Sequence, residues 1–451
     1  MREKCCMGEQ CGNPRIRCYD ASRGRSAARD SQTSMSPLNR SSFRSWVLLW
    51  LATAGVGVAS GQQLTSSELA PAPPYDSGSG VPGPAEMFTT PNTAVTYRNM
   101  EEIFPTRRVA AGEEASPLQT GKLPDIRYDY DHSSHSVADF VKRTDTTGLL
   151  ILEGDRILFE GYYEGADSKD LFMSFSAGKS FVSTLVGIAL GEGKIKSLGD
   201  PIAAYLPELK GSAYETATIK QVLQMASGTS YTEEYEDKNS GIAQFVAIVA
   251  RGRGGLYDFA RSFKGAEKPG TRFYYATTNT EILGALVARV TGMPLAEYMS
   301  EKLWRPLGAE APARWILDQP GSAGREVAGG GLQVRLRDYG RFGLLFANLG
   351  RWHGRQLLPA GWVEQATRPA DDYVQFGKLL PNYPLGYGYQ WWCLPGPHHR
   401  FTAQGIHGQF VLVDPEEHLV LVKLSSWKHA WEDDKEAETY AFFSAVADAV
   451  R

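Results

Sequence analysis

The sequence predicts an α/β (α+β) fold: an antiparallel sheet flanked by helices, with a largely helical subdomain inserted into it. Two strand–turn–strand patterns carry this prediction, and they lie far apart in the 451-residue chain. In residues 149–163 two apolar runs flank a Glu-Gly-Asp turn, and in residues 410–424 two apolar runs flank Pro415–His418. The chain between these hairpins has a mostly helical pattern. Strands from both halves of a chain that enclose a helical middle indicate one sheet backed by helices.

Helical periodicity identifies the elements between and after the hairpins. The run Phe181–Leu190 is apolar on nearly every side, so we expect this helix to be buried. Residues 435–450 have the pattern of a closing amphipathic helix. Residues 97–137 mix polar and apolar side chains without a clear period, so we expect irregular structure there. Further helices are expected at Ile219–Met225, Ile282–Val290, Leu295–Leu303 and Asp338–Ala347.

The first 95 residues differ in composition from the rest. Trp46–Gly61 is apolar and uncharged, ends in small residues and follows two arginines, which is the layout of a signal peptide. Translation from Met35 would give this signal peptide, about residues 35–61, an ordinary length, whereas a retained membrane anchor is the alternative. Residues 62–95 are rich in Pro, Ser, Gly and Ala, which predicts a flexible linker. We therefore expect an exported protein, periplasmic or secreted, with no membrane span in the mature chain.

These observations divide the chain into three parts. Residues 1–61 are the signal peptide with the segment upstream of it, residues 62–95 are the linker, and residues 96–451 are the folded domain. Within the domain we expect an α/β part at about residues 96–180 and 325–451, and a helical part at about residues 181–324.

Charge and cysteine content limit the function classes. The net charge is −4 at pH 7, and residues 1–61 hold nine Lys/Arg against four Asp/Glu, so the remainder carries −9. An acidic body argues against nucleic acid as the main partner. Cys393 is the only cysteine beyond the first twenty residues, and the cysteines clustered there have no histidine near them. We expect no internal disulfide, no metal and no cofactor, and a small molecule as the partner.

Residues 174–180 (SFSAGKS) contain the strongest chemical motif, a Ser–x–x–Lys pair at the start of the predicted buried helix. Residues three apart share one face of a helix, so the Lys179 amine can reach the Ser176 hydroxyl. A serine becomes a nucleophile when a base takes its proton, and a lysine can act as that base when burial lowers its pKa. The helix N-terminus also offers N–H groups to a developing oxyanion. Because Ser–x–x–Lys is common by chance, the assignment depends on two further blocks.

These two blocks lie later in the chain. In residues 268–284 a Pro-Gly turn leads to Tyr275 and a helix follows; a tyrosine beside a lysine amine can share its proton and act as a general base. In residues 403–410, Gly405 and Gly408 stand at what we interpret as the start of a strand. Glycine lets a backbone approach a ligand closely, and a strand edge there can supply a second oxyanion N–H. Each block alone also has an ordinary explanation, a cluster of core aromatics or a strand with a glycine bulge.

Together, the three blocks and their order resemble the serine β-lactamase and penicillin-binding superfamily. Within it, the sequence is most similar to the class C-like 6-aminohexanoate-dimer hydrolases (nylon-oligomer hydrolases) and related esterases. The resemblance runs from about Tyr97 to the end of the chain and implies a β-lactamase/transpeptidase-like fold. Arg98–Val109 resembles the lead-in of the 6-aminohexanoate-dimer hydrolases. Other stretches that resemble the superfamily's phrases are Asp200–Leu209, Leu223–Gly228, Leu336–Leu345 and Tyr387–Trp392.

The resemblance implies a role for each residue that matches a superfamily motif. Ser176 would be the nucleophile, with Lys179 and Tyr275 as its general base pair. The backbone N–H groups of Ser176 and Ile406 would form the oxyanion hole. The chemistry implied is hydrolysis of a short amide or ester bond through an acyl-enzyme on Ser176.

The sequence departs from the superfamily's pattern near the substrate. The usual Tyr–x–Asn reads Tyr275–Ala–Thr277, which leaves Thr277 or Asn279 to contact substrate. The Lys–Thr–Gly of true β-lactamases is replaced by Gly-Ile-His-Gly from Gly405 onward. These losses argue against turnover of β-lactams more than against acyl-enzyme chemistry. His407 either lines the site or has a structural role.

Two further side chains are candidates for substrate contact. Tyr235 lies in the loop after Ser227-Gly228, which either reaches the substrate or is a solvated loop. Trp391, with Trp392 beside it, either forms an apolar wall of the pocket or belongs to the core.

Other functions remain open at this point. D-alanyl-D-alanine carboxypeptidase or β-lactamase-like activity would use the same residues. An α/β-hydrolase esterase would use Ser176 in SFSAG, which is close to Gly–x–Ser–x–Gly, with His407 downstream. That fold requires repeated βαβ units, which the helical middle does not show. A non-catalytic penicillin-binding sensor would keep the scaffold without turnover.

Overall fold

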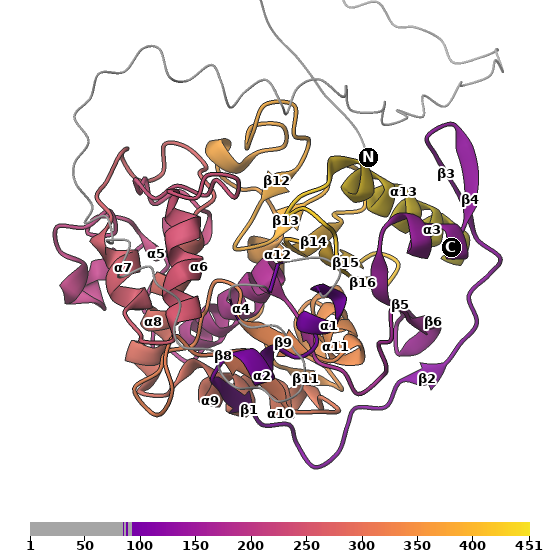
Figure 1. Ribbon diagram of the computed structural model, residues 1–451, viewed down its shortest axis with the longest axis horizontal. Coiled ribbons are helices and arrows are strands. Elements are labelled where there is room, and N and C mark those ends of the chain that lie inside the picture. The colour runs from indigo at the N-terminus through magenta and orange to yellow at the C-terminus, as the bar shows by residue number, and fades with distance from the viewer. Residues whose placement is uncertain (1–83, 85–86, 89–92) are drawn as a thin grey trace, which may run out of the picture. The chain divides into compact units, whose positions relative to one another are not determined.

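Figure 1 shows the computed structural model, which describes residues 84, 87–88 and 93–451. The predicted signal peptide and nearly all of the predicted linker lie outside these described residues. No helix in the described ranges combines the length and the apolar character that a membrane span requires.

The central element is an eight-stranded sheet built from both halves of the described chain. In order across the sheet its strands are β12 (Gly386–Tyr387), β13 (Trp392–Cys393), β14 (Phe401–Gly405), β15 (Gln409–Asp414), β16 (Leu419–Ser425), β5 (Thr146–Glu153), β6 (Arg156–Tyr162) and β2 (Gln119–Thr120). The two predicted hairpins are β5–β6 and β15–β16, and they meet where β16 pairs antiparallel with β5. Only the short edge pair β2–β6 is parallel. The predicted antiparallel sheet is therefore confirmed.

Side chains alternate between the two faces of this sheet, and helices cover both. Leu421 of β16 joins the apolar cluster beneath α13 (Asp433–Val450), whereas Val422 joins the cluster on the opposite face. α3 (Val137–Arg143) lies on the same face as α13 and contacts it. The closing helix predicted at residues 435–450 is thus confirmed as α13.

Two buried helices fill the opposite face. α11 (Leu336–Ala347) lies so close to the sheet that a side chain at Gly343 would meet Val420 Cγ1 at 2.5 Å. Behind it runs α4 (Gly178–Gly191), whose residues from Gly178 to Ala189 are all buried. The predicted burial of the apolar run that begins at Phe181 is confirmed.

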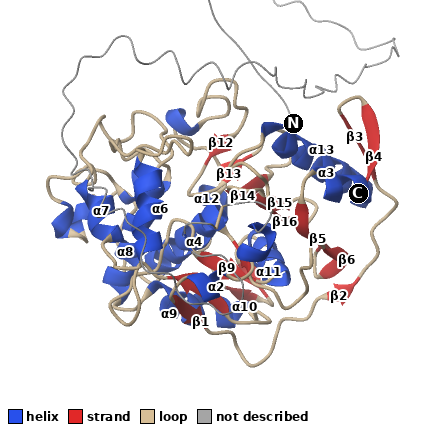
Figure 2. Cartoon of the chain, in the orientation of Figure 1, coloured by secondary structure: helices blue, strands red, loops and turns tan. Residues whose placement is uncertain are grey.

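The regular elements between α4 and β8 (Ala313–Ile316) are helices, and Figure 2 shows α6 (Gly241–Arg251), α7 (Leu256–Ser262) and α8 (Thr277–Thr291) grouped to one side of the strands. α8 packs against both α4 and α7. Two of these helices, α6 and α7, lie where no helix was predicted, although a serine cap and a left-handed glycine mark the two ends of α6. The helices here are α5 (Ile219–Leu223), α6 (Gly241–Arg251), α7 (Leu256–Ser262), α8 (Thr277–Thr291), α9 (Leu295–Met299), a π-helical turn (Ser300–Trp304) and α10 (Arg305–Leu307).

Residues 97–137, predicted to be irregular, also contain short helices and strands between their irregular stretches. Each of these elements spans two to four residues, which are too few to show a period. β1 (Thr106–Val109) pairs with a strand far along the chain, with Thr106 opposite Ile316. They are α2 (Met100–Ile103), β1 (Thr106–Val109), β2, and the hairpin β3 (Arg127–Tyr130) and β4 (Ser133–Ser136), preceded by α1 (Thr93–Thr96). β1 belongs to a second sheet with β8 (Ala313–Ile316), β9 (Leu332–Val334) and β7 (Phe172–Met173), in that order. The remaining short elements are β10 (Arg351–Trp352), β11 (Arg355–Gln356) and α12 (Trp362–Ala366).

Candidate active site

Ser176 lies at the sharp turn that leads from β7 into α4. A single turn of 3₁₀ helix holds it, and Phe175 there adopts a φ of 44°, a left-handed conformation that is costly for a bulky residue. The surroundings enforce this conformation. Phe175 is buried against the ring of Tyr97, with centroids 4.9 Å apart, and the Ser174 N–H donates to the carbonyl of Leu332 in β9 at 2.8 Å. Backbone strain that the fold maintains in this way is typical of functional sites.

Lys179 lies one turn farther along α4, and its amine contacts the serine hydroxyl. Nζ is 2.9 Å from Ser176 Oγ and donates to the carbonyl oxygen of Gly329 at 2.5 Å. The residue is 1% exposed, and burial lowers the pKa of its amine to about 8, against the opposing effect of the Glu233 and Glu281 charges. A buried amine with this pKa can exist as the free base and accept a proton.

Tyr275 comes from the segment before α8, yet its ring lies 5.2 Å from Lys179 Nζ. Burial raises the pKa of its hydroxyl above the usual range, the charge of Glu233 raises it further, and a hydrogen bond with Ser176 lowers it. Trp392 stacks on the tyrosine ring, with centroids 5.8 Å apart and an interplanar angle of 17°. The structure therefore brings together the three residues that the sequence indicated from separate blocks.

Gly405 and Ile406 lie where β14 ends, beside the Ser176 turn. A Cβ atom at Gly405 would stand 2.4 Å from Ser174 O and 3.1 Å from Ser176 N, so only glycine lets the strand end approach this closely. Ile406 packs against the cluster that contains Phe175. The two proposed oxyanion donors thus belong to segments in contact. Gly405 is the last residue of β14 and does not begin a strand, whereas Gly408 directly precedes β15, so the two glycines lie at the two ends of the turn between these strands.

Glu233 belongs to the loop after Gly228, which the sequence predicts either to reach the substrate or to be solvated, and it ties this loop to the start of α8. Its carboxylate accepts hydrogen bonds from the Thr277 hydroxyl at 2.6 Å and the Thr277 N–H at 2.8 Å. The hydroxyl of Tyr235 donates to Glu233 Oε1 at 2.8 Å and also interacts with Ser176. Tyr235 is 41% exposed as a whole residue, but its hydroxyl end is enclosed, and burial raises its pKa. Tyr235 therefore reaches from the surface into the site.

Comparison with known proteins identifies the family. Residues 135–445 match the family model described as "Beta-lactamase". The 6-aminohexanoate-dimer hydrolase of Paenarthrobacter ureafaciens is 31% identical over 350 residues, which are 75% of this chain and 86% of that protein. The chain belongs to the β-lactamase family.

Other relatives agree with this membership. A putative 6-aminohexanoate-dimer hydrolase from Bacillus anthracis has a solved structure with a TM-score of 0.72, at 24% identity over 80% of this chain and 95% of that one, which shows a shared fold. The lovastatin esterase of Penicillium rubens is 27% identical over 240 residues, 44% of this chain and 58% of that protein. The resemblance drawn from the sequence is confirmed, and this β-lactamase-family chain is an enzyme, a serine hydrolase of the amidase or esterase type.

The α/β-hydrolase alternative is wrong for this β-lactamase-family fold, because the main sheet is antiparallel outside the β2–β6 pair. His407, which that alternative would use as a base, has other contacts. It is 5% exposed, its Nδ1 lies 2.8 Å from Trp427 O, and its ring packs against Phe88 and Phe175. Burial lowers the pKa of this imidazole to about 4. Of the two roles left open for His407, these contacts favour the structural one, holding the turn that follows Ile406.

Two other substrate-contact candidates are buried in contacts with residues other than the three predicted catalytic ones. Asn279 is fully buried, and its Oδ1 accepts from the Ser227 hydroxyl at 2.7 Å. Trp391 lies in the core, with its ring centroid 4.4 Å from that of Phe346. Neighbouring side chains of an extended segment point in opposite directions, so Trp392, not Trp391, reaches the site. Which of two adjacent tryptophans does so depends on the strand register, which the sequence does not show.

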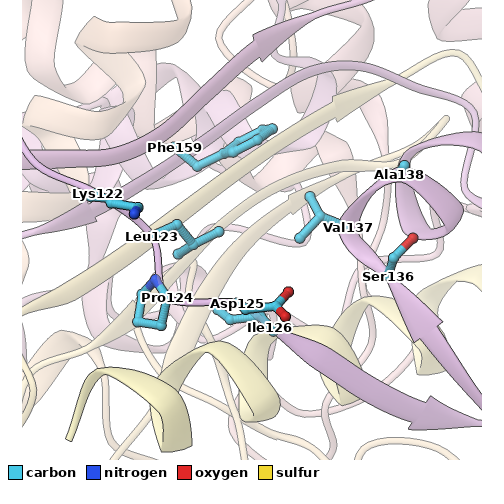
Figure 3. A pocket seen from close by; sticks show the side chains of 9 residues that line it. All are labelled: Lys122, Leu123, Pro124, Asp125, Ile126, Ser136, Val137, Ala138 and Phe159. Atoms are coloured by element: carbon cyan, nitrogen blue, oxygen red, sulfur yellow. The ribbon is translucent and has the colours of Figure 1, made fainter.

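A surface hollow of about 650 Å³ lies elsewhere, beside β6 and the start of α3 (Figure 3). None of the predicted site residues lines it, so we assign it no part in catalysis. Its lining comprises Lys122, Leu123, Pro124, Asp125, Ile126, Ser136, Val137, Ala138 and Phe159.

Proposed function

We propose that this enzyme hydrolyses short amide or ester bonds through an acyl-enzyme on Ser176. The observation that carries the proposal is the 2.9 Å contact between Ser176 Oγ and the buried Lys179 amine. The free amine takes the hydroxyl proton while Oγ attacks the substrate carbonyl carbon. The oxyanion that forms is stabilised by the N–H groups of Ser176 and Ile406.

The remaining steps use the same groups. When the tetrahedral intermediate collapses, the bond to the leaving amine or alcohol breaks, and the leaving group takes a proton from the Lys179–Tyr275 pair. Water then attacks the acyl-enzyme and gives a proton to the pair. The carboxylic acid leaves, and the Ser176 hydroxyl is restored.

We propose short linear amides and esters as the substrate class. One relative is named for a short linear amide and another for an ester, and the same nucleophile and base serve both kinds of bond. Because the hydroxyl of Tyr235 interacts with Ser176, we propose that Tyr235 contacts either kind of substrate. On the pattern of residues 35–61 alone, we further propose that the enzyme is exported to the periplasm or the medium.

The pH dependence of kcat/KM should report the deprotonation of Lys179. Because the amine acts as a base only when neutral, and its pKa is about 8, kcat/KM for p-nitrophenyl acetate should fall about tenfold per pH unit below pH 8. Above pH 8 it should level off. The measurement is initial rate between pH 5.5 and 9.5 with the spontaneous hydrolysis subtracted. A fall in kcat/KM that begins only near pH 4–5 would point to a carboxylate base instead and contradict the role of Lys179.

Short esters should be hydrolysed well and penicillins poorly. Binding of the β-lactam carboxylate relies on the Lys–Thr–Gly strand in the superfamily, and the segment that begins at Gly405 lacks the charge of that lysine. His407 could replace the charge only when protonated, and it is buried with a pKa of about 4, so it is neutral at pH 7. A missing charge-assisted contact costs about 1.5–3 kcal/mol, or tenfold to over a hundredfold in kcat/KM. Thr277, in place of the usual Asn, is bonded to Glu233 instead.

The assay compares kcat/KM for p-nitrophenyl butyrate, benzylpenicillin and a D-alanyl-D-alanine peptide. Equal values for the ester and the penicillin would show that the turn after β14 still recognises lactams. Preference for the peptide would favour the carboxypeptidase alternative. Labelling of Ser176 without turnover of any substrate would favour the sensor.

A further inference from the structure

We propose that Glu281 is a positioning residue for Lys179 and acts through the backbone of Gly329. This role rests on the proposed function. Glu281 lies on α8, one turn after Thr277, and is 6% exposed. Its Oε1 accepts the Gly329 N–H at 2.6 Å, and the carbonyl of the same glycine accepts Lys179 Nζ at 2.5 Å. A continuous path of hydrogen bonds therefore runs from Glu281 through one residue's backbone to the amine beside Ser176.

The segment that carries Gly329 is held by its neighbours, because it lies between β8 and β9 and not within a strand. A Cβ atom at Gly329 would stand 2.5 Å from Thr277 Cγ2 and 3.1 Å from Glu281 Oε1. A Cβ atom at Gly330 would stand 3.2 Å from the carbonyl carbon of Phe175. The glycine run is thus caught between α8 and the Ser176 turn. The glutamate supplies a specific hydrogen bond at this contact.

This arrangement matters because a neutral amine has two N–H bonds and one lone pair. With one N–H bonded to the Gly329 carbonyl, rotation about the last bond of the lysine is restricted, and the lone pair can be held toward Ser176 Oγ. Without an acceptor at residue 281, the buried Gly329 N–H loses its partner, and the segment shifts to satisfy it. The Lys179 amine would then lose its orientation while remaining present and buried.

The test compares Glu281→Leu with Glu281→Gln. Leucine has similar volume but accepts no hydrogen bond, whereas the glutamine oxygen can still accept the Gly329 N–H. The readouts are the second-order rate of Ser176 labelling by a fluorophosphonate and the separate kcat and KM for p-nitrophenyl acetate. We expect E281L to lower the labelling rate and kcat about 10- to 100-fold, with KM nearly unchanged. We expect E281Q to restore both to within about threefold of wild type.

Two further variants guard against a simple loss of folding. Gly329→Ala keeps the Glu281 carboxylate in the chain but places a Cβ atom 2.5 Å from Thr277 Cγ2 and 3.1 Å from Glu281 Oε1, which displaces the same carbonyl. It should lower the labelling rate in the same range. Glu438→Leu is the matched control: Glu438 is also buried, accepts from the Tyr128 hydroxyl at 2.6 Å and pairs with Arg143 on the far face of the sheet. It should lower the Tm but leave the labelling rate unchanged.

Each outcome decides the proposal. Wild-type labelling rates in E281L, or an E281Q variant as slow as E281L, would overturn the positioning role. Slow labelling in the Glu438 control as well would show that the loss reflects general destabilisation, and would also overturn it. Failure of the wild-type protein to be labelled at Ser176 would reject the proposed function itself, and this role with it.

Discussion

Replacement of Ser176 with alanine should reduce kcat for p-nitrophenyl esters by about 10³- to 10⁶-fold, because the acyl-enzyme can no longer form. Substrate affinity should change little, since the hydroxyl is one small part of the binding surface. Alanine fits the 3₁₀ turn without new contacts, so the Tm should stay close to that of the wild type. Fluorophosphonate treatment followed by peptide mass spectrometry should find an adduct on Ser176 in the wild type and none in S176A.

A serine on the same helix provides the control. Ser183 is fully buried in α4, and its Oγ has no hydrogen-bond partner among the described residues. Removal of an unpartnered buried hydroxyl costs little or stabilises, so Ser183→Ala should keep full activity and a normal Tm. Near-normal turnover in S176A would refute the whole mechanism. Equal loss of activity in S176A and S183A would show that any substitution in this helix disrupts the site, and that the loss in S176A does not report the missing nucleophile.

Replacement of Lys179 with methionine should abolish activity to a similar extent without destabilising the protein. Methionine fills the volume but accepts no proton. Because the two residues act as a unit, the double variant S176A/K179M should be no slower than either single variant. The comparison of all three kcat values tests this non-additivity.

The stability expected of K179M follows from the same burial that lowers the pKa of the Lys179 amine. Lowering the Lys179 pKa from 10.5 to about 8 means that the unfolded chain holds the proton more tightly, which costs the folded state roughly 3 kcal/mol below pH 8. In K179M the hydrogen bonds of Lys179 to Ser176 and Gly329 are lost, and each loss offsets about 1 kcal/mol of the stability gained by removing the buried amine. K179M should therefore be at least as stable as the wild type in urea unfolding at pH 7.

Lys423 gives a matched comparison for this variant. It is fully buried in β16, burial likewise lowers its pKa, and its amine donates to the carbonyl of Thr144 at 3.2 Å, away from Ser176. Lys423→Met should show a similar stability but keep its esterase activity. A marked destabilisation of K179M, together with loss of activity, would mean that Lys179 is needed mainly for folding.

The features of this protein that could be predicted from its sequence are long repeating patterns and contacts between residues close together in the chain. The two long hairpins and the apolar helix α4 have patterns that extend over many residues, so their period is visible along the chain. The Ser176–Lys179 contact also needs only local information, because a spacing of three on a helix places both side chains on one face and the apolar helix buries the amine. These features determine the fold class and the contact between Ser176 and Lys179.

The rest of the site depends on contacts between distant segments. A strand as short as β1 is defined by a partner about two hundred residues away. That Trp392 and not Trp391 contacts Tyr275 depends on the face of the sheet on which each side chain lies. Asn279 looks available in the sequence, but α8 turns it toward Ser227.

The most specific contacts also arise only on folding. Glu233 is one acidic residue among several in a polar loop until folding brings it to Thr277, and Gly329 is one glycine in a run until α8 and the Ser176 turn close on it. The sequence by itself therefore determined the fold class, the family and the contact between Ser176 and Lys179, because each depends on residues near one another or on a pattern that repeats. Only the tertiary structure decided what surrounds that contact, because burial and hydrogen bonding there are set by segments that meet from different parts of the chain.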